Sequence, residues 1–285
     1  MESRRPSTTY LFVPAIDGHK VERALHSGVD TVILDLEDSI VEQLKGEARG
    51  AVGRVGATRS PRGGPEIWVR INGEDTPWFA GDLENTDWKT VDGAVLPKAE
   101  SVSAVRALTQ VGVRRVILLI ESVAGLAGLS LMVSAVAEVE RVALGTWDLA
   151  LDLGLVTLDD PDESELIWQL RGHLVVESRR LNLLPPIDGV YTRFKDDDGL
   201  RAASRRAQHL GFGAKLLIHP RQIPIVRSAF SPDPGAVAFA REVVRVYEDA
   251  AMHHEGVVQV RGQAIDRPMV ERARAVLKRW GDSGA

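Results

Sequence analysis

The stretch Thr31-Val32-Ile33-Leu34-Asp35-Leu36-Glu37-Asp38 joins an apolar run to three carboxylates that fall within four residues. Its first four residues are of the β-branched and apolar types that form buried strands. An ionised carboxylate is costly to bury unless a cation or hydrogen bonds compensate it. Acids at the end of a buried strand therefore indicate a site that holds a metal ion, a proton or a polar substrate.

The same design recurs at four later points of the chain, where an apolar run ends in a polar side chain. Five such strand ends at regular spacing predict one active site to which several strands contribute. The four later segments are Val69-Arg70-Ile71-Asn72, Leu96-Pro97-Lys98, Leu119-Ile120-Glu121 and Gly145-Thr146-Trp147-Asp148.

Short apolar runs alternate with longer amphipathic stretches, which predicts strands followed by helices. Because the apolar runs lack strict alternation, we expect parallel strands that are buried on both faces. Eight strand–helix units in about 230 residues fit a (β/α)₈ barrel, whose active site lies at the carboxyl ends of the strands. A doubly wound open sheet is the alternative, but no glycine-rich fingerprint follows the first strand. The expected strands are 9–15, 31–37, 66–72, 93–98, 115–121, 141–147, 187–191 and 214–219, and the expected helices lie near 18–27, 42–57, 76–86, 101–111, 123–137, 162–183, 197–210 and 221–230.

The chain has 285 residues, a net charge of −5 and a pI near 5.9, and it contains no cysteine. This charge balance favours neither nucleic acid nor an anionic membrane as a partner. The lack of cysteine excludes disulfides, thiolate metal sites and a cysteine nucleophile. The first apolar run, 10–15, is too short for a signal or membrane helix, so we expect a soluble, cytoplasmic protein.

The pattern changes after residue 231, which predicts a barrel domain over 1–231 and a C-terminal extension over 232–285. The extension is too short for an independent domain and should pack on its own barrel or on a neighbouring subunit. Asp266 is expected to be the N-cap of its last helix. The expected elements of the extension are a helix, a hairpin and a last helix at 236–252, 256–265 and 268–280. Three polar segments are expected to be exposed or mobile, 60–65, His253-His254 and 281–285.

Glu121 and Asp148 end consecutive strands, which lie side by side in a barrel. Two carboxylates that leave positions open for water and substrate suit Mg²⁺. The absence of cysteine, and of a histidine cluster at these strand ends, argues against zinc. The alternative is a structural ion network in which one or both acids pair with Arg70 or Lys98.

Two basic residues, Arg70 and Lys98, also end apolar runs. The planar guanidinium of Arg70 can bind a substrate carboxylate or a developing oxyanion, or it can pair with Asp35, Glu37 or Asp38. Lys98 stands where a Schiff-base lysine would stand, but the surrounding carboxylates should raise its pKa. We therefore expect Lys98 to have a structural or electrostatic role rather than to act as an amine nucleophile.

The chain contains, in this order, the motifs LFVP (11–14), ILDLED (33–38), VRIN (69–72), LPKAES (96–101), LIES (119–122), GTWDLALDLG (145–154), IDGVYT (187–192) and GFGAKLLIHPRQI (211–223). This ordered set resembles the HpcH/HpaI aldolase and citrate lyase β-subunit family. The segment GQAIDRP (262–268) resembles the extension of the branch that acts on CoA thioesters. The resemblance implies a (β/α)₈ barrel, trimeric or hexameric, that uses Mg²⁺ to cleave or form a C–C bond next to a carbonyl.

By that resemblance, Glu121 and Asp148 are the metal ligands. Arg70 binds the substrate and stabilises an oxyanion. Glu37 and Asp38 hold metal-bound water and Arg70.

The resemblance also implies that Asp266 is the acid/base and reaches the active site of an adjacent subunit. Taken by itself, Asp266 is more simply the N-cap of the last helix. Glu121 and Lys98 are further expected to contact the substrate beside Arg70.

Two segments depart from the family's pattern. Ala15-Ile16-Asp17-Gly18 stands where Gly-Asp-Arg-Pro is usual, at the barrel mouth, so the resemblance implies CoA binding less strongly than metal binding. Gly145-Thr146-Trp147-Asp148 stands in place of Gly-Ala-Glu-Asp and keeps the aspartate without its neighbouring acid. Trp147 is expected to narrow the acyl pocket or to pack against the fifth strand.

We expect a Mg²⁺-dependent lyase that cleaves or forms a 3-hydroxyacyl-CoA, such as citramalyl-CoA or malyl-CoA, by a retro-Claisen reaction. The products would be a 2-oxoacid and a short acyl-CoA. One alternative is a class II aldolase on free 2-oxo-4-hydroxy acids, which would not need Asp266. Another is a non-catalytic subunit of a lyase complex. Apart from the substrate, the only expected partners are further copies of this chain.

Overall fold

The computed structural model describes residues 6–57, 64–155, 160–251 and 257–280. The chain divides into two compact units, Met1–Phe230 and Ser231–Ala285. Of the three polar segments expected to be exposed or mobile, His253-His254 and 281–285 lie outside the described residues, as does most of 60–65.

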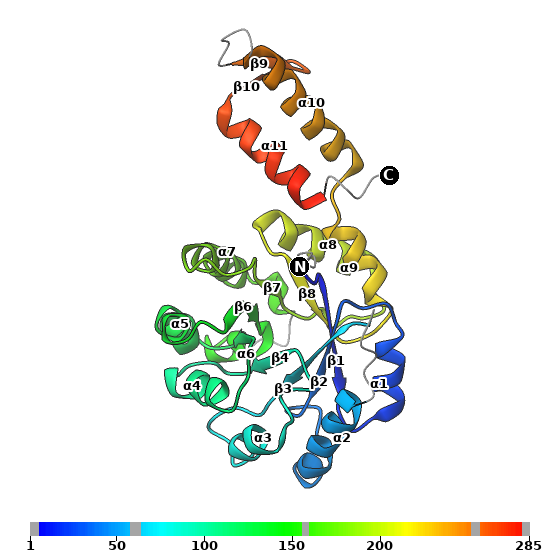
Figure 1. The fold of residues 1–285 in the computed structure, drawn as a ribbon, viewed down its shortest axis with the longest axis vertical. Helices are drawn as coiled ribbons and strands as arrows, with labels where there is room; N and C mark the ends of the chain where they lie inside the picture. Colours follow the sequence, from blue (N-terminus) through cyan, green and yellow to red (C-terminus); the bar gives the residue numbers. More distant parts are fainter. Residues whose placement is uncertain (1–5, 58–63, 156–159, 252–256, 281–285) are drawn as a thin grey trace. The chain divides into compact units, whose positions relative to one another are not determined.

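Eight parallel strands close into a barrel in the first unit, in the order β1 to β8. Figure 1 shows helices around this barrel. The architecture confirms the predicted (β/α)₈ fold. The strands are β1 (Thr9–Pro14), β2 (Thr31–Asp35), β3 (Glu66–Arg70), β4 (Gly93–Leu96), β5 (Val116–Ile120), β6 (Val139–Leu144), β7 (Ile187–Asp188) and β8 (Ala214–Leu217).

Two hydrophobic layers explain why the strand sequences lack strict alternation. Tyr10, Ile33 and Trp68 belong to the cluster inside the barrel. Their chain neighbours, among them Leu11 and Val32, belong to the larger cluster shared with the helices. Both faces of a strand are therefore buried, as in β5, where all five residues are buried.

The helices of the first unit follow the strands in the expected alternation. Those after β4 and β5 begin at serine caps: the side chains of Ser101 and Ser122 accept the backbone N–H groups of Ala104 and Gly125 over 3.1 and 3.0 Å. The helices are α1 (Gly18–Leu25), α2 (Lys45–Ala57), α3 (Phe79–Asn85), α4 (Val102–Gln110), α5 (Val123–Ala135), α6 (Thr146–Asp152), α7 (Glu165–Arg180), α8 (Asp197–Leu210) and α9 (Gln222–Phe230), with short 3₁₀ turns η1 (Glu42–Leu44) and η2 (Pro161–Glu163).

The prediction of a strand over 141–147 is wrong at its C-terminal end. β6 stops at Leu144, and helix α6 begins at Thr146. A helix forms here because Thr146, Leu149 and Ala150 recur at helical spacing and are buried. Asp148 therefore lies in the first turn of a helix, where the helix dipole favours a carboxylate, and not at a strand end. The strand predicted over 187–191 is also too long, since β7 contains only two residues.

A buried ion group joins the short strand β7 to its neighbours. The Asp188 carboxylate accepts hydrogen bonds from Lys215 of β8 and from Arg171 of α7, the latter over 2.8 Å. The three side chains are at most 1% exposed. Burial alone would raise the pKa of Asp188, but Lys215 and Arg171 outweigh it and hold that pKa below its usual value.

The second unit contains α10 (Pro234–Ala251), the antiparallel pair β9 (Val258–Val260) and β10 (Gln263–Ile265), and α11 (Arg267–Trp280). Val243, Val260 and Ile265 belong to its small core. Asp266 directly precedes α11, and its carboxylate accepts the backbone N–H of Met269 over 3.2 Å. This contact confirms the predicted N-cap.

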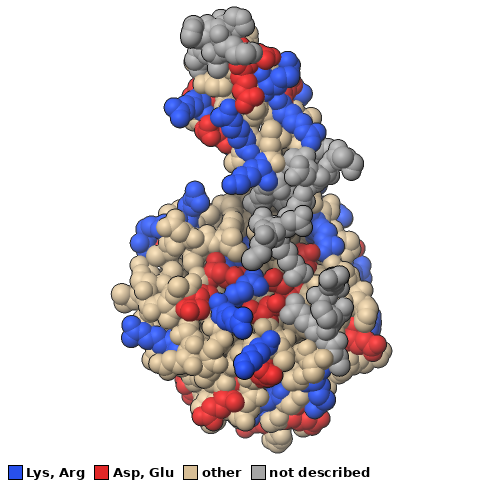
Figure 2. All heavy atoms as spheres, viewed as in Figure 1, with Lys and Arg blue, Asp and Glu red and all other residues tan. Residues whose placement is uncertain are grey.

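Acidic and basic side chains both occur on the surface, as the net charge of −5 leads one to expect. Figure 2 shows basic side chains interspersed with acidic ones on the face that it draws. A continuous basic surface is the usual footprint of nucleic-acid binding. Among the helices that the structure describes, none is long and apolar enough to cross a membrane.

Asp188→Asn should lower the free energy of unfolding by about 3 kcal/mol, because it leaves the buried cations Lys215 and Arg171 without their shared counter-charge. Urea unfolding followed by circular dichroism measures this loss. Asp198→Asn is the control, since it breaks an ion pair with Arg201 in which the carboxylate is 96% exposed. The control should unfold as the unchanged protein does, and equal losses in the two variants would contradict the assigned role of Asp188.

Candidate active site

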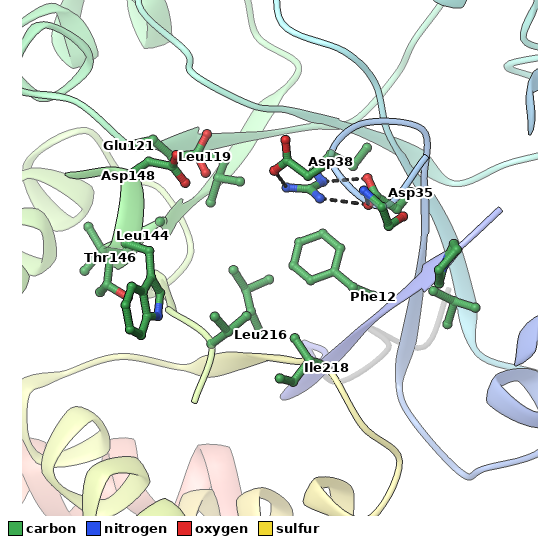
Figure 3. A pocket seen from close by; sticks show the side chains of 17 residues that line it. Phe12, Asp35, Asp38, Leu119, Glu121, Leu144, Thr146, Asp148, Leu216 and Ile218 are labelled. Atoms are coloured by element: carbon green, nitrogen blue, oxygen red, sulfur yellow. Dashed lines mark hydrogen bonds and ion pairs between the residues drawn. The ribbon is translucent and has the colours of Figure 1, made fainter. Parts of the chain in front are cut away.

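A pocket of about 450 Å³ opens at the carboxyl ends of the barrel strands (Figure 3). Its lining comes from the ends of β1, β2, β3, β5, β6, β7 and β8 and from the start of α6. The pocket brings together four of the residues predicted from the sequence, Arg70, Asp38, Glu121 and Asp148. It also includes Asp35, which the sequence predicts both as one of the three strand-end acids and as a possible partner of Arg70.

A bidentate ion pair between Arg70 and Asp35 forms one side of the pocket. Arg70 Nε donates to Asp35 Oδ1 over 2.7 Å, and Nη2 donates to Oδ2 over 2.8 Å. The backbone N–H groups of Glu37 and Ser39 also donate to this carboxylate. Burial alone would raise the pKa of Asp35, but Arg70 outweighs it and lowers that pKa. Asp35 is therefore an ionised anchor that fixes the plane of the guanidinium.

Glu37 and Asp38 meet the remaining nitrogen of the same guanidinium. Arg70 Nη1 lies 2.9 Å from Glu37 Oε2 and 3.4 Å from Asp38 Oδ2. Glu37 is buried, and desolvation raises its pKa although Arg70 acts in the opposite direction. Asp38 has a side chain that is 65% exposed. Both predicted neighbours of Arg70 are thus in place.

Lys98 connects the two acidic sides of the site. Its Nζ lies 3.2 Å from Glu37 Oε1, and its backbone N–H donates to Glu121 Oε2 over 2.8 Å. Desolvation would lower the pKa of Lys98, but Glu37 and the other acids outweigh it and raise that pKa. The direction agrees with the expectation from the sequence and favours a charged ammonium over a free amine.

Glu121 follows β5 directly, and its residue is only 6% exposed. Burial, with Glu37 and Asp148 nearby, raises its pKa to about 8. Gly145 lies against this carboxylate: a Cβ atom at that position would stand 2.5 Å from Glu121 Oε1. Only glycine therefore leaves room for the carboxylate, which the sequence pattern alone does not reveal.

Asp148 reaches the same pocket from the first turn of α6 and is exposed. Figure 3 shows the side chains of Glu121 and Asp148 close together, across the pocket from Asp35 and Asp38. Among the described residues, no group of three or more His, Cys, Asp or Glu side chains is arranged to hold a metal ion. Two carboxylates with positions left for water and substrate still fit a hard divalent cation. The pKa of Glu121 is raised because burial and the neighbouring acids outweigh the Lys98 N–H and the charge of Arg70, which act in the opposite direction.

Apolar side chains separate the two charged sides of the pocket. Figure 3 shows Phe12, Leu119 and Leu216 in this region. Phe12 also supports the guanidinium of Arg70, whose central carbon lies 4.7 Å from the ring centre. Trp147 lines the same pocket from α6 and is 40% exposed. Its expected role in narrowing an acyl pocket stays a prediction.

Lys45 is a buried residue of the site's surroundings that the sequence reading missed. Its ammonium donates to the carbonyls of Leu36 and Glu37, each over 2.7 Å, and to Asn72 Oδ1 over 2.6 Å. The sequence offers no signal for this role, because Lys45 stands in an expected helix where charged residues are usually solvated. Asp266 belongs to the second unit, and its expected role as acid/base stays a prediction.

Comparison with known proteins agrees with the fold. The sequence matches the model of the HpcH/HpaI aldolase/citrate lyase family over residues 8–220. A (3S)-malyl-CoA thioesterase of Cereibacter sphaeroides is 31% identical over 275 residues, which cover 95% of this chain and 94% of the relative. The citrate lyase subunit beta of Leuconostoc mesenteroides subsp. cremoris is 30% identical over 290 residues, which cover 98% of this chain and 94% of the relative. An L-malyl-CoA/beta-methylmalyl-CoA lyase of Cereibacter sphaeroides is 30% identical over 302 residues, which cover 96% of this chain and 94% of the relative.

Solved structures show the same relationship. CitE from Mycobacterium tuberculosis, in complex with magnesium, acetoacetate and coenzyme A, matches with a TM-score of 0.81 at 29% identity. The match covers 98% of this chain and 100% of that chain. The chain belongs to the HpcH/HpaI aldolase/citrate lyase family.

Proposed function

We propose that this chain is a Mg²⁺-dependent lyase that cleaves or forms a 3-hydroxyacyl-CoA, such as malyl-CoA or citramalyl-CoA. The products of cleavage are a 2-oxoacid and a short acyl-CoA. The observation that carries the proposal is the pocket itself, in which the buried Glu121 and the exposed Asp148 lie opposite a fixed Arg70. The relatives named for malyl-CoA and beta-methylmalyl-CoA support this substrate class.

Glu121 and Asp148 are the proposed metal ligands. Both present carboxylate oxygens, which Mg²⁺ prefers, and the related CitE structure contains magnesium. A bound Mg²⁺ would polarise the hydroxyl and carboxylate oxygens of the substrate. The Lys98 N–H and the close approach of Gly145 fix the Glu121 carboxylate in one orientation.

Arg70 is the proposed partner of the carboxylate or developing oxyanion in the 2-oxoacid half. Arg70 donates its Nε hydrogen and one Nη2 hydrogen to Asp35. These contacts leave the second Nη2 hydrogen of Arg70 for the substrate. Since the guanidinium is fixed before the substrate binds, it needs no reorganisation during the reaction. Glu37 and Asp38 keep its other nitrogen in place, and Lys98 adds positive charge beside Glu37.

Asp266 is the proposed acid/base, contributed by an adjacent subunit of a trimer or hexamer. In cleavage, the substrate hydroxyl releases its proton to water and becomes the carbonyl of the 2-oxoacid. The electron pair of the broken C–C bond passes to the α-carbon of the thioester, which the carboxylic acid of Asp266 then protonates. The reverse reaction removes that proton.

Two other activities remain as alternatives. Hydrolysis of the thioester is favoured by the name of the (3S)-malyl-CoA thioesterase relative. Cleavage of free 2-oxo-4-hydroxy acids is favoured by the changed segment after β1, where Asp17 caps α1 by accepting the Lys20 N–H over 3.0 Å. A non-catalytic subunit would not turn over any of these substrates by itself.

Turnover of malyl-, beta-methylmalyl- and citramalyl-CoA, with and without Mg²⁺, tests the proposed function. We expect equal amounts of 2-oxoacid and acyl-CoA, no reaction in EDTA, and recovery when Mg²⁺ is added back. A thiol reagent detects hydrolysis without interference, because the chain contains no cysteine. Release of free CoA as the main product would support the thioesterase. Activity confined to free hydroxy-oxo acids would support the aldolase, and no turnover at all would support the non-catalytic subunit.

Gly145→Ala should weaken Mg²⁺ binding by about tenfold or more, because the added Cβ displaces the Glu121 carboxylate. Isothermal titration calorimetry measures the affinity. Gly53→Ala in α2 is the matched control, since a Cβ there meets nothing within 4 Å. Unchanged Mg²⁺ affinity in Gly145→Ala would remove Glu121 from the proposed ligands.

Mg²⁺ binding should strengthen as the pH rises toward 8. The pKa of Glu121 is about 8, so at lower pH the ion has to displace a proton from this carboxyl group. The apparent affinity should therefore rise by up to about tenfold per pH unit below that value and level off above it. Calorimetry in buffers of different ionisation enthalpy also counts the released proton. An affinity that does not change with pH would contradict Glu121 as a ligand.

A further inference from the structure

Lys45 is the first residue of α2, and its residue is only 6% exposed. Its Nζ donates to three acceptors, the carbonyl oxygens of Leu36 and Glu37 and the side-chain oxygen of Asn72, over 2.7, 2.7 and 2.6 Å. None of the three oxygens can donate a hydrogen, so the nitrogen has to supply all three. The residue is therefore present as an ammonium group that is fully occupied by the protein.

The third acceptor is itself fixed. Asn72 donates through its backbone N–H and through Nδ2 to Asp82 Oδ2, over 2.8 and 2.6 Å. The other oxygen of the Asp82 carboxylate accepts from Arg49 Nε over 2.6 Å. Asp82 is fully buried, so this chain of contacts is rigid and anchors the ammonium of Lys45 to the helix layer around β3.

The first two acceptors belong to the segment that carries the acids of the site. Leu36 and Glu37 follow β2, and their carbonyls point to Lys45 and not into a strand ladder. The side chain of Glu37 contacts the basic residues of the site. Its Oε2 lies 2.9 Å from Arg70 Nη1, and its Oε1 lies 3.2 Å from Lys98 Nζ. The orientation of two peptide groups thus decides where the Glu37 side chain begins.

We propose that Lys45 is a positioning residue of the active site, which fixes the peptides of Leu36 and Glu37 and so aims the Glu37 and Asp38 carboxylates at Arg70. Without the ammonium, the Leu36 carbonyl would lack a partner and the Glu37 carbonyl would keep only the Ile40 N–H, which donates to it over 3.0 Å. The segment would have to rotate to give the Leu36 carbonyl a new partner. Rotation would separate Glu37 from Arg70 and Lys98. Arg70 would keep Asp35 but lose the contacts that hold Nη1.

The kinetic part of this inference rests on the proposed lyase function. Lys45→Met keeps the length and volume of the side chain and removes the ammonium. We expect kcat to fall by about a hundredfold, because misplacing a charged group in an active site by about 1 Å has an effect of that size. The KM for the thioester should change by less than about threefold, since the segment lies at the reacting end of the site. Lys45→Gln keeps an amide donor and serves in the same assay if the methionine variant does not fold.

Lys215→Met is the matched control. Lys215 is also buried, at 0% exposed, but its ammonium pairs with Asp188 between β7 and β8. This variant should lose as much thermal stability as Lys45→Met while it keeps kcat. If both variants lose kcat in proportion to stability, Lys45 has a structural role only and the inference is overturned.

Chemical rescue separates the ammonium from the rest of the side chain. Because the chain contains no cysteine, Lys45→Cys carries a single thiol, which can be alkylated in the denatured protein before refolding. An aminoethyl group recreates a lysine-like ammonium, and a propyl group gives the same length without charge or donors. We expect the aminoethyl form to recover most of kcat and the propyl form to stay as slow as Lys45→Met. Equal activity of the two refolded forms would overturn the inference.

Hydrogen exchange provides a readout that does not depend on the reaction. The N–H groups of Glu37 and Ser39 donate to Asp35, so their exchange reports on the segment after β2. They should exchange faster in Lys45→Met than in the unchanged protein and in Lys215→Met. If the unchanged protein cleaves no thioester but the exchange result holds, the proposed function fails and the positioning role stands. If these amides are as protected as before, the positioning role fails whatever the enzyme's substrate is.

Discussion

The ion pair between Arg70 and Asp35 is the interaction on which the rest of the site depends. Asp35 is the last residue of β2 and is 2% exposed, so its charge has to be compensated inside the protein. Two parallel hydrogen bonds to the neighbouring strand provide that compensation and fix the guanidinium plane. Glu37 and Asp38 can approach Arg70 only because the arginine is already held in this position. The barrel register makes the pair possible, since it places Asp35 directly beside Arg70.

On the opposite side of the pocket, the pKa of the buried carboxylate Glu121 is raised, whereas that of Asp35 is lowered. Glu121 is nearly as buried as Asp35, yet burial and neighbouring acids raise its pKa to about 8. The protein therefore offsets the burial of Asp35 with the charge of Arg70, whereas the Lys98 N–H and the charge of Arg70 do not offset the burial of Glu121. A carboxylate left in this state, next to a second one at the start of α6, gains most from an added cation. The asymmetry between Asp35 and Glu121 is the physical argument for the metal site that we propose at Glu121.

The sequence predicted much of this arrangement because the strand ends carry it. The apolar runs before Arg70, Lys98 and Glu121 locate strands, and a closed parallel barrel brings their ends together. Helix α6 was missed because a short apolar run fits a strand and a helix equally well. Lys45 and Gly145 were missed for a different reason. Their roles depend on which atoms lie within 3 Å of them across the fold, and local patterns contain no such information.

The central claim is that Glu121 and Asp148 together bind the divalent cation opposite Arg70. A crystal of the protein grown with Mn²⁺ in place of Mg²⁺ tests it directly, since the anomalous scattering of Mn²⁺ locates the ion. We predict one strong peak in contact with carboxylate oxygens of both Glu121 and Asp148. A peak elsewhere in the barrel, or no peak in a protein that cleaves the thioester, would contradict the account.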